Sequence, residues 1–175
     1  MLKLATQTDI KIVMEIINDA KLYLREQNSL QWNQADGYPA EKDLLKDISN
    51  KSCYLYLENN EVLGVMSIIL TPDENYAEID GKWLTSSDYA SIHRIAVKKN
   101  CHNKNIGAKM LLEAEGIVKQ HDIYSIKIDT HKINIPMTKT ILKSGYSFCG
   151  IIKLKRSNVD NLRDAYEKKL AKNEG

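Results

Sequence analysis

The chain has 175 residues, of which 43% are hydrophobic and 27% charged, and its formal net charge is +2 at pH 7. This length suits a single domain over residues 1–175, and the near-neutral charge argues against a dedicated nucleic-acid-binding protein. Three widely spaced cysteines, no secretion signal and no apolar run long enough to cross a membrane predict a cytoplasmic protein with reduced thiols and no metal site.

The first part of the chain predicts a short strand followed by a long helix. Residues 2–5 alternate weakly, as a strand does. Thr6 and Asp9 have the spacing of a capping box at a helix start. Apolar residues then recur at helical spacing, which predicts an amphipathic helix that ends near Asn28. The next segment, QWNQADGYP, is predicted to be a loop because it contains Asp-Gly and Pro.

The middle of the chain predicts a helix and then strands. Residues 41–49 are predicted to be a short helix. Residues 52–58 and 61–70 have strand character and are joined at Asn59-Asn60, which indicates a hairpin. A further strand is predicted over 76–83.

The second half predicts alternating strands and helices. The predicted strands are 91–97, 124–129, 146–154 and 164–170, and the predicted helices are 106–118 and 133–144. Pro136 lies in the first turn of the second of these helices, and Gly145 ends it. The charge pattern of the last strand, 164–170, also suits a helix. The strand–helix–strand order within some forty residues predicts two parallel strands with a right-handed connection.

The polar segment CHNKNIGAK, residues 101–109, lies at the amino end of the helix in that connection. Helix amino ends present free N–H groups and the positive end of the helix dipole, and both favour anions. Lys104 adds positive charge, and Asn105 and Gly107 tolerate a left-handed backbone. The segment therefore predicts a phosphate site, and the alternative is a solvated helix start made of ordinary turn residues.

From Ile92 to Phe148 the chain resembles the GNAT superfamily of acetyl-CoA-dependent N-acetyltransferases. IHRIAV resembles the strand before the family's coenzyme loop, HNKNIG resembles the loop, and Asn134 followed by a helix and Gly145-Tyr146 resembles a later motif. The stretches QWNQADGYP, DTHKINIPM and AYEKKL resemble a bacterial subgroup of unassigned substrate. The resemblance implies an α/β (α+β) fold: a mixed, mostly antiparallel sheet of about six to seven strands, splayed between the fourth and fifth, with helices on both faces.

The resemblance implies direct transfer of an acetyl group from acetyl-CoA to a primary amine of a small molecule. Two alternatives stay open, namely acetylation of a protein N-terminus or lysine, and a non-catalytic acyl-CoA-binding regulatory module. The regulatory-module alternative is based on three departures from the family pattern. His102 replaces an Arg or Gln, and Asn105 replaces a Gly. Ile141 stands where many members have a Tyr that is thought to protonate the departing thiolate. The expected partners are acetyl-CoA and the amine, without nucleic acid or membrane, and a homodimer is left open.

Acetyl transfer needs a base, because an amine of pKa about 10.4 is mostly protonated at pH 7. His93, on the strand that lines the cleft by resemblance, is the candidate base; the alternative is a histidine packed in the sheet. Asp129 and His131 end the next strand and are candidates to orient the amine or relay a proton, or else they bond nearby backbone. Arg94 is expected to be structural and to face away from His93 unless a bulge changes the alternation.

The remaining candidates bind the two substrates. By resemblance the pantetheine arm pairs with a strand edge and the pyrophosphate meets loop N–H groups. The candidate coenzyme-binding residues are Ile95, Ala96, Val97, His102, Asn103, Lys104, Asn105, Ile106, Gly107, Ala108 and Asn134. The candidate acceptor-binding residues are Trp32, Tyr38 and Trp83, which alternatively belong to the core or to a dimer contact.

Overall fold

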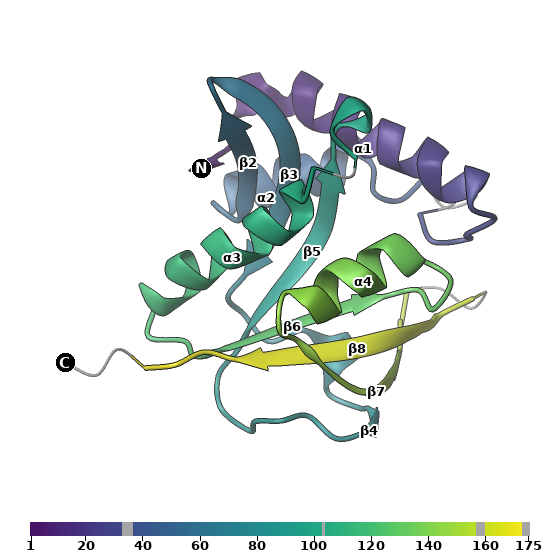
Figure 1. The fold of residues 1–175 in the computed structure, drawn as a ribbon, viewed down its shortest axis with the longest axis vertical. Coiled ribbons are helices and arrows are strands. Elements are labelled where there is room, and N and C mark those ends of the chain that lie inside the picture. Colours follow the sequence, from purple (N-terminus) through teal and green to yellow (C-terminus); the bar gives the residue numbers. More distant parts are fainter. Residues whose placement is uncertain (33–36, 103, 157–159, 173–175) are drawn as a thin grey trace.

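The computed structural model describes residues 1–32, 37–102, 104–156 and 160–172. In this part of the chain, eight strands form one sheet in the order β1-β2-β3-β5-β6-β8-β7-β4 (Figure 1). The strands are β1 (Leu2–Leu4), β2 (Cys53–Glu58), β3 (Glu61–Ile69), β4 (Asp80–Gly81), β5 (Ala90–Val97), β6 (Ser125–Thr130), β7 (Ser147–Lys153) and β8 (Leu162–Lys169). All neighbouring pairs are antiparallel except β5 and β6. The predicted fold class is confirmed, with more strands than expected.

Four α-helices flank the sheet in the described residues: α1 (Ile10–Glu26), α2 (Glu41–Ser49), α3 (Ile106–Lys119) and α4 (Ile135–Lys143). The capping box that precedes α1 forms as predicted, since the Asp9 carboxylate accepts hydrogen bonds from the backbone N–H and the hydroxyl of Thr6, both at 2.8 Å. Gly145 follows α4 with a φ of +86°, the left-handed geometry that ends helices.

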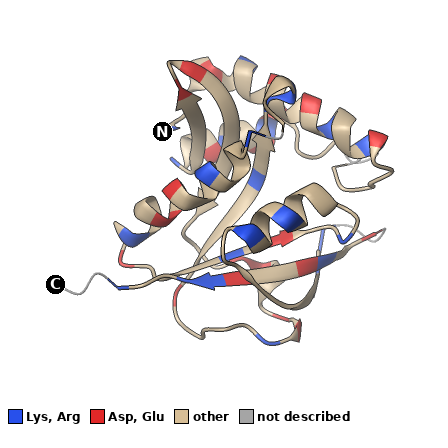
Figure 2. Cartoon of the chain, viewed as in Figure 1, with Lys and Arg blue, Asp and Glu red and all other residues tan. Residues whose placement is uncertain are grey.

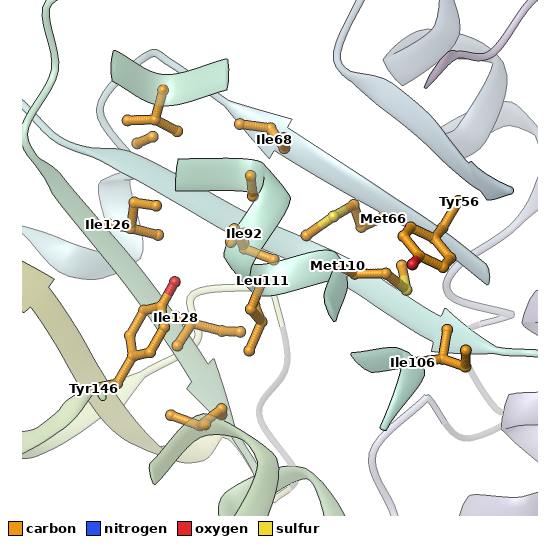
Figure 3. Packing of buried hydrophobic residues seen from close by; sticks show 14 of the residues in the cluster. Tyr56, Met66, Ile68, Ile92, Ile106, Met110, Leu111, Ile126, Ile128 and Tyr146 are labelled. Carbon is orange, nitrogen blue, oxygen red and sulfur yellow. The ribbon is translucent and has the colours of Figure 1, made fainter. Parts of the chain in front are cut away.

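The helices cover both faces of the sheet. On one face, Met110 and Leu111 of α3 pack on strand residues that include Ile92 and Ile126 (Figure 3). On the other face, Val13 and other apolar residues of α1 and α2 pack on β2, β3 and β5. Each helix is amphipathic and buries only its apolar face, and this face determines how the helix packs on the sheet.

The sheet splays between β5 and β6. Only Ala90 to Ile92 of β5 pair with β6, opposite Ile126 to Ile128. Beyond Ile92, β5 continues beside β3 alone while β6 continues beside β8. Arg94 interrupts the pairing of β5 with β3 by a bulge, where its φ is +51°. The splay and the bulge together open the molecule at the carboxyl end of β5.

The prediction of a strand over 76–83 is wrong for most of its length. Only Asp80 and Gly81 pair, with β7, and a 3-10 turn occupies Glu74–Tyr76. The Trp83 indole donates to the Tyr76 carbonyl at 3.0 Å, and directly after the segment the buried Glu167 carboxylate accepts from the Leu84 amide at 2.6 Å. The last predicted strand is confirmed as β8, so its helical alternative is wrong.

Candidate active site

A cleft of about 1140 Å³ opens where β5 and β6 diverge. One end is bordered by α1, by the later part of β5 and by the amino ends of α3 and α4. The other end is bordered by the segment after β3, by the end of β6 and by residues that flank the β7–β8 connection. After the residues that the sequence predicted to bind each substrate, we call these the coenzyme end and the acceptor end.

The amino end of α3 forms the wall of the coenzyme end. Asn105 is the N-cap of α3 in a left-handed conformation, with φ +57°, as its residue type predicted. Gly107 lies close to α4, because a Cβ on it would sit 3.3 Å from the Thr140 methyl group. The ammonium of Lys143 donates to the Asn105 side-chain oxygen at 3.2 Å, so α4 brings a cation to the start of α3.

Most candidate coenzyme residues line this cleft. They are Ile95, Ala96, Val97, His102, Asn105, Ile106, Gly107, Ala108 and Asn134. Lys104 is exposed and is not among the described lining residues, and Asn103 lies outside the described residues. The His102 ring packs edge-on against Tyr23, with 4.8 Å between ring centroids. The Asn134 side chain caps α4, since its oxygen accepts from the Met137 amide at 3.3 Å.

His93 lies in the cleft beside a carboxylate that the sequence had not indicated. Its Nε2 is 2.9 Å from Asp73 Oδ2 and 3.1 Å from Ser91 Oγ, and its Nδ1 makes no hydrogen bond within the described chain. Burial opposes ionisation of Asp73, but the hydrogen bond and charge of His93 and two hydrogen bonds from Asn75 lower the pKa of Asp73 overall. Asp73 is therefore an anion that holds the imidazole by one nitrogen.

Arg94 also lines the cleft. The bulge interrupts the regular alternation of side chains between the two faces of the sheet, on which the prediction for Arg94 was based. Its Nη1 lies 2.6 Å from Asp47 Oδ2, and the same carboxylate oxygen accepts from Ser67 Oγ at 2.5 Å. This buried ion pair agrees with the expected structural role of Arg94.

The two polar candidates at the end of β6 have different surroundings in the structure. Asp129 lines the cleft, where its Oδ2 accepts a 2.7 Å hydrogen bond from the Tyr76 hydroxyl. His131 is buried and is not among the described lining residues; its Nε2 lies 2.8 Å from Asp160 Oδ1. Both His93 and Asp129 thus line the cleft, whereas His131 is buried beside Asp160.

Among the aromatic candidates, Trp32 and Tyr38 line the cleft. Trp83 is not among the described lining residues; its ring packs against Tyr76 and lies 4.2 Å from the Lys127 ammonium. Ile141 is fully buried in the core that α4 shares with α3, so it offers no polar group to the cleft.

Sequence reasoning missed three polar lining residues of the acceptor end, Asp73, Arg156 and Arg163, and also Tyr76, which bonds the lining residue Asp129. All of them belong to turns or to strands far along the chain from His93. Asp73 alone had a local signal, the polar turn TPDEN directly after an apolar strand, which marks a loop at a strand end without saying which strand lies beside it.

The described chain contains no helix long and apolar enough to cross a membrane and no group of three His, Cys, Asp or Glu residues placed to hold a metal ion. Charges of both signs are distributed over its helices and strands (Figure 2).

Comparison with solved structures supports this architecture. A GNAT-family acetyltransferase from Streptococcus agalactiae 2603 superposes with a TM-score of 0.88 at 29% identity, covering 98% of this chain and 96% of the other. A ribosomal-protein-alanine N-acetyltransferase from Brucella melitensis gives a TM-score of 0.68 at 17% identity, covering 97% and 99%. An aminoglycoside acetyltransferase in complex with coenzyme A and kanamycin gives 0.67 at 17%, covering 97% and 94%.

No curated protein matches the chain. The model of the acetyltransferase (GNAT) family matches residues 17–146, which include the splayed strands, the start of α3 and the whole of α4. This match spans well over half of the sequence and covers the coenzyme end of the cleft. The chain therefore belongs to the GNAT family of acetyltransferases.

Proposed function

We propose that this protein transfers the acetyl group of acetyl-CoA directly to a primary amine of a small molecule, with His93 as the general base. The observation that carries the proposal is the His93–Asp73 pair in the cleft at the point where β5 leaves β6. The coenzyme end fits the coenzyme chemically, because a strand edge there lacks a neighbour on one side and a helix start offers N–H groups beside the Lys143 ammonium.

In this proposal His93 accepts the proton that the amine must lose. Asp73 holds Nε2, so Nδ1 is the nitrogen that receives the proton, directly or through a water. The free amine then attacks the thioester carbonyl and a C–N bond forms. The nitrogen loses its second proton to solvent water, and the C–S bond breaks to release the neutral amide and coenzyme A as a thiolate. A thiolate leaves without a protein acid near neutral pH because a thiol has a pKa of about 8.5, which removes the need for a Tyr in place of Ile141.

The test measures thiol release from acetyl-CoA in the presence of a panel of amines. His93→Ala is expected to lower kcat/KM by about a hundredfold or more, the usual contribution of general base catalysis, without changing coenzyme affinity. Asp73→Asn keeps the size of the side chain, and we expect a smaller loss in kcat/KM, because the imidazolium loses a neighbouring negative charge.

His121→Ala is the matched control, since His121 is exposed and lies outside the cleft-lining residues. Unchanged turnover in His93→Ala would overturn the role of His93. Tight coenzyme binding with no turnover on any amine would instead favour the regulatory module, and turnover confined to peptides would favour a protein acceptor.

A further inference from the structure

The acceptor end contains a buried cation that the proposed transfer does not use. Arg163 lines the cleft, yet only 5% of it is exposed. Its side chain donates two hydrogen bonds, both from Nη1, to the carbonyl oxygens of Asp160 at 2.7 Å and Leu162 at 2.8 Å. Within the described chain this guanidinium has no carboxylate at ion-pair distance. Burying a cation without a directly bonded anion is unfavourable, although two carboxylates nearby partly compensate for this burial.

A second guanidinium lies in the same wall. Arg156 also lines the cleft, and its Cζ is 3.4 Å from the centroid of the Tyr38 ring. The pKa of Arg163 is lowered, first by burial and also by the charge of Arg156, although two nearby carboxylates partly oppose these effects. Two neighbouring cations that repel each other form a site for an anion, and the planar guanidinium matches a carboxylate with two parallel hydrogen bonds.

One Tyr–Asp pair connects the candidate base with Arg163. The ring centroids of His93 and Tyr76 are 5.9 Å apart, and the Tyr76 hydroxyl donates to Asp129 at 2.7 Å. Asp129 is the carboxylate whose charge acts most strongly on Arg163. His93 and Arg163 therefore lie near the same Tyr–Asp pair, and both line the one cleft, where a single bound molecule can meet both.

We propose that the acceptor is a small amine that also bears a carboxylate, as an amino acid does, and that Arg163 and Arg156 bind this carboxylate while the amine faces His93. This inference rests on the proposed function, because it names the acceptor class of the same site. The carboxylates of Asp73 and Asp129 attract the ammonium form of the acceptor, and the arginines attract its anionic end. An acceptor with positive charges only would meet the arginines unfavourably.

The first experiment compares acceptors that differ only in the carboxylate. Each amino acid in the panel is assayed beside its primary amide and its decarboxylated amine, with kanamycin as a polycationic acceptor. We expect kcat/KM to be at least about tenfold higher for the carboxylate form, the amount that one charged hydrogen bond contributes. This preference would oppose intrinsic reactivity, because amidation lowers the pKa of the neighbouring amine and leaves more of it unprotonated.

The second experiment removes the arginines. Arg163→Gln and Arg156→Gln are each expected to raise KM for the carboxylate acceptor by about tenfold to a hundredfold and to abolish the preference over the amide. Arg163→Lys keeps the charge and is expected to retain part of the preference. The control is Lys153→Gln, which removes one exposed charge from β7 outside the cleft. Calorimetric binding of coenzyme A shows that each variant is folded.

Efficient turnover of amides or kanamycin that is unchanged by Arg163→Gln and Arg156→Gln would overturn the inference and leave the proposed function intact. Coenzyme binding without acetylation of any amine would instead overturn the proposed function. Loss of the carboxylate preference in the folded arginine variants, with an unchanged KM for acetyl-CoA, is the result that supports the inference.

Discussion

Burial controls the thiol chemistry of this protein at the scale of single residues. Cys53, Cys101 and Cys149 are all buried and free. Burial, with the nearby negative charge of Asp47, raises the pKa of Cys53 to about 12, although Arg94 partly opposes this effect. Because the thiolate is the reactive form, Cys53 is a packing residue in the folded protein.

This raised pKa predicts both slow labelling and a pH dependence of stability. At pH 8 Ellman's reagent is expected to label Cys53 only in protein unfolded by guanidinium chloride, as mapped by mass spectrometry. Above about pH 9 the unfolded thiol loses its proton while the folded one keeps it, so Cys53 lowers the free energy of unfolding as the pH rises toward 12. Rapid labelling of Cys53 in the folded protein would contradict this prediction.

At the scale of elements, the start of α3 depends on one left-handed residue. Asn105 has a φ of +57°, which costs a β-branched residue about 1–2 kcal/mol and costs glycine nothing. Asn105→Val is therefore expected to lower the free energy of unfolding in urea by about 1–2 kcal/mol, and Asn105→Gly to change it by less than about 0.5 kcal/mol. Equal losses in the two variants would show that the Lys143 hydrogen bond, and not the backbone geometry, determines stability here.

The elements also show what the sequence could predict. The helices followed from their apolar periods and caps, and the hairpin of β2 and β3 followed from Asn59-Asn60. The strand predicted over 76–83 was wrong because tertiary contacts shape this part of the chain: the Trp83 indole bonds the Tyr76 carbonyl, and directly after the segment the Leu84 amide bonds Glu167, more than eighty residues away. The same holds for the site. His93 followed from the family resemblance of its strand and Asp129 from its place at a strand end, whereas Asp73 and Arg163 reach the cleft through tertiary contacts that no local pattern identified.

At the scale of the whole molecule, coenzyme binding is expected to stabilise the fold, because a ligand that binds only the folded state adds to its free energy of unfolding. At a hundred times Kd the gain is about 2.7 kcal/mol, which corresponds to a rise in Tm of about 5–10 °C for a chain of this size. Differential scanning fluorimetry with coenzyme A measures this rise. ATP, which has phosphates and no pantetheine arm, serves as the control ligand, and an equal rise with ATP would contradict the proposed fit.

The splay of the sheet gives the cleft one end built from strands and helices and another built largely from connecting segments. The coenzyme end is made of β5, α3 and α4, whose geometry is tied to the core on both faces. The acceptor end draws on connections between elements, among them the turn at Asp73 and the segments beside Arg156 and Arg163. Substitutions and insertions in those connections leave the sheet intact, so descendants of this chain can acquire a new acceptor while they keep the same acyl donor.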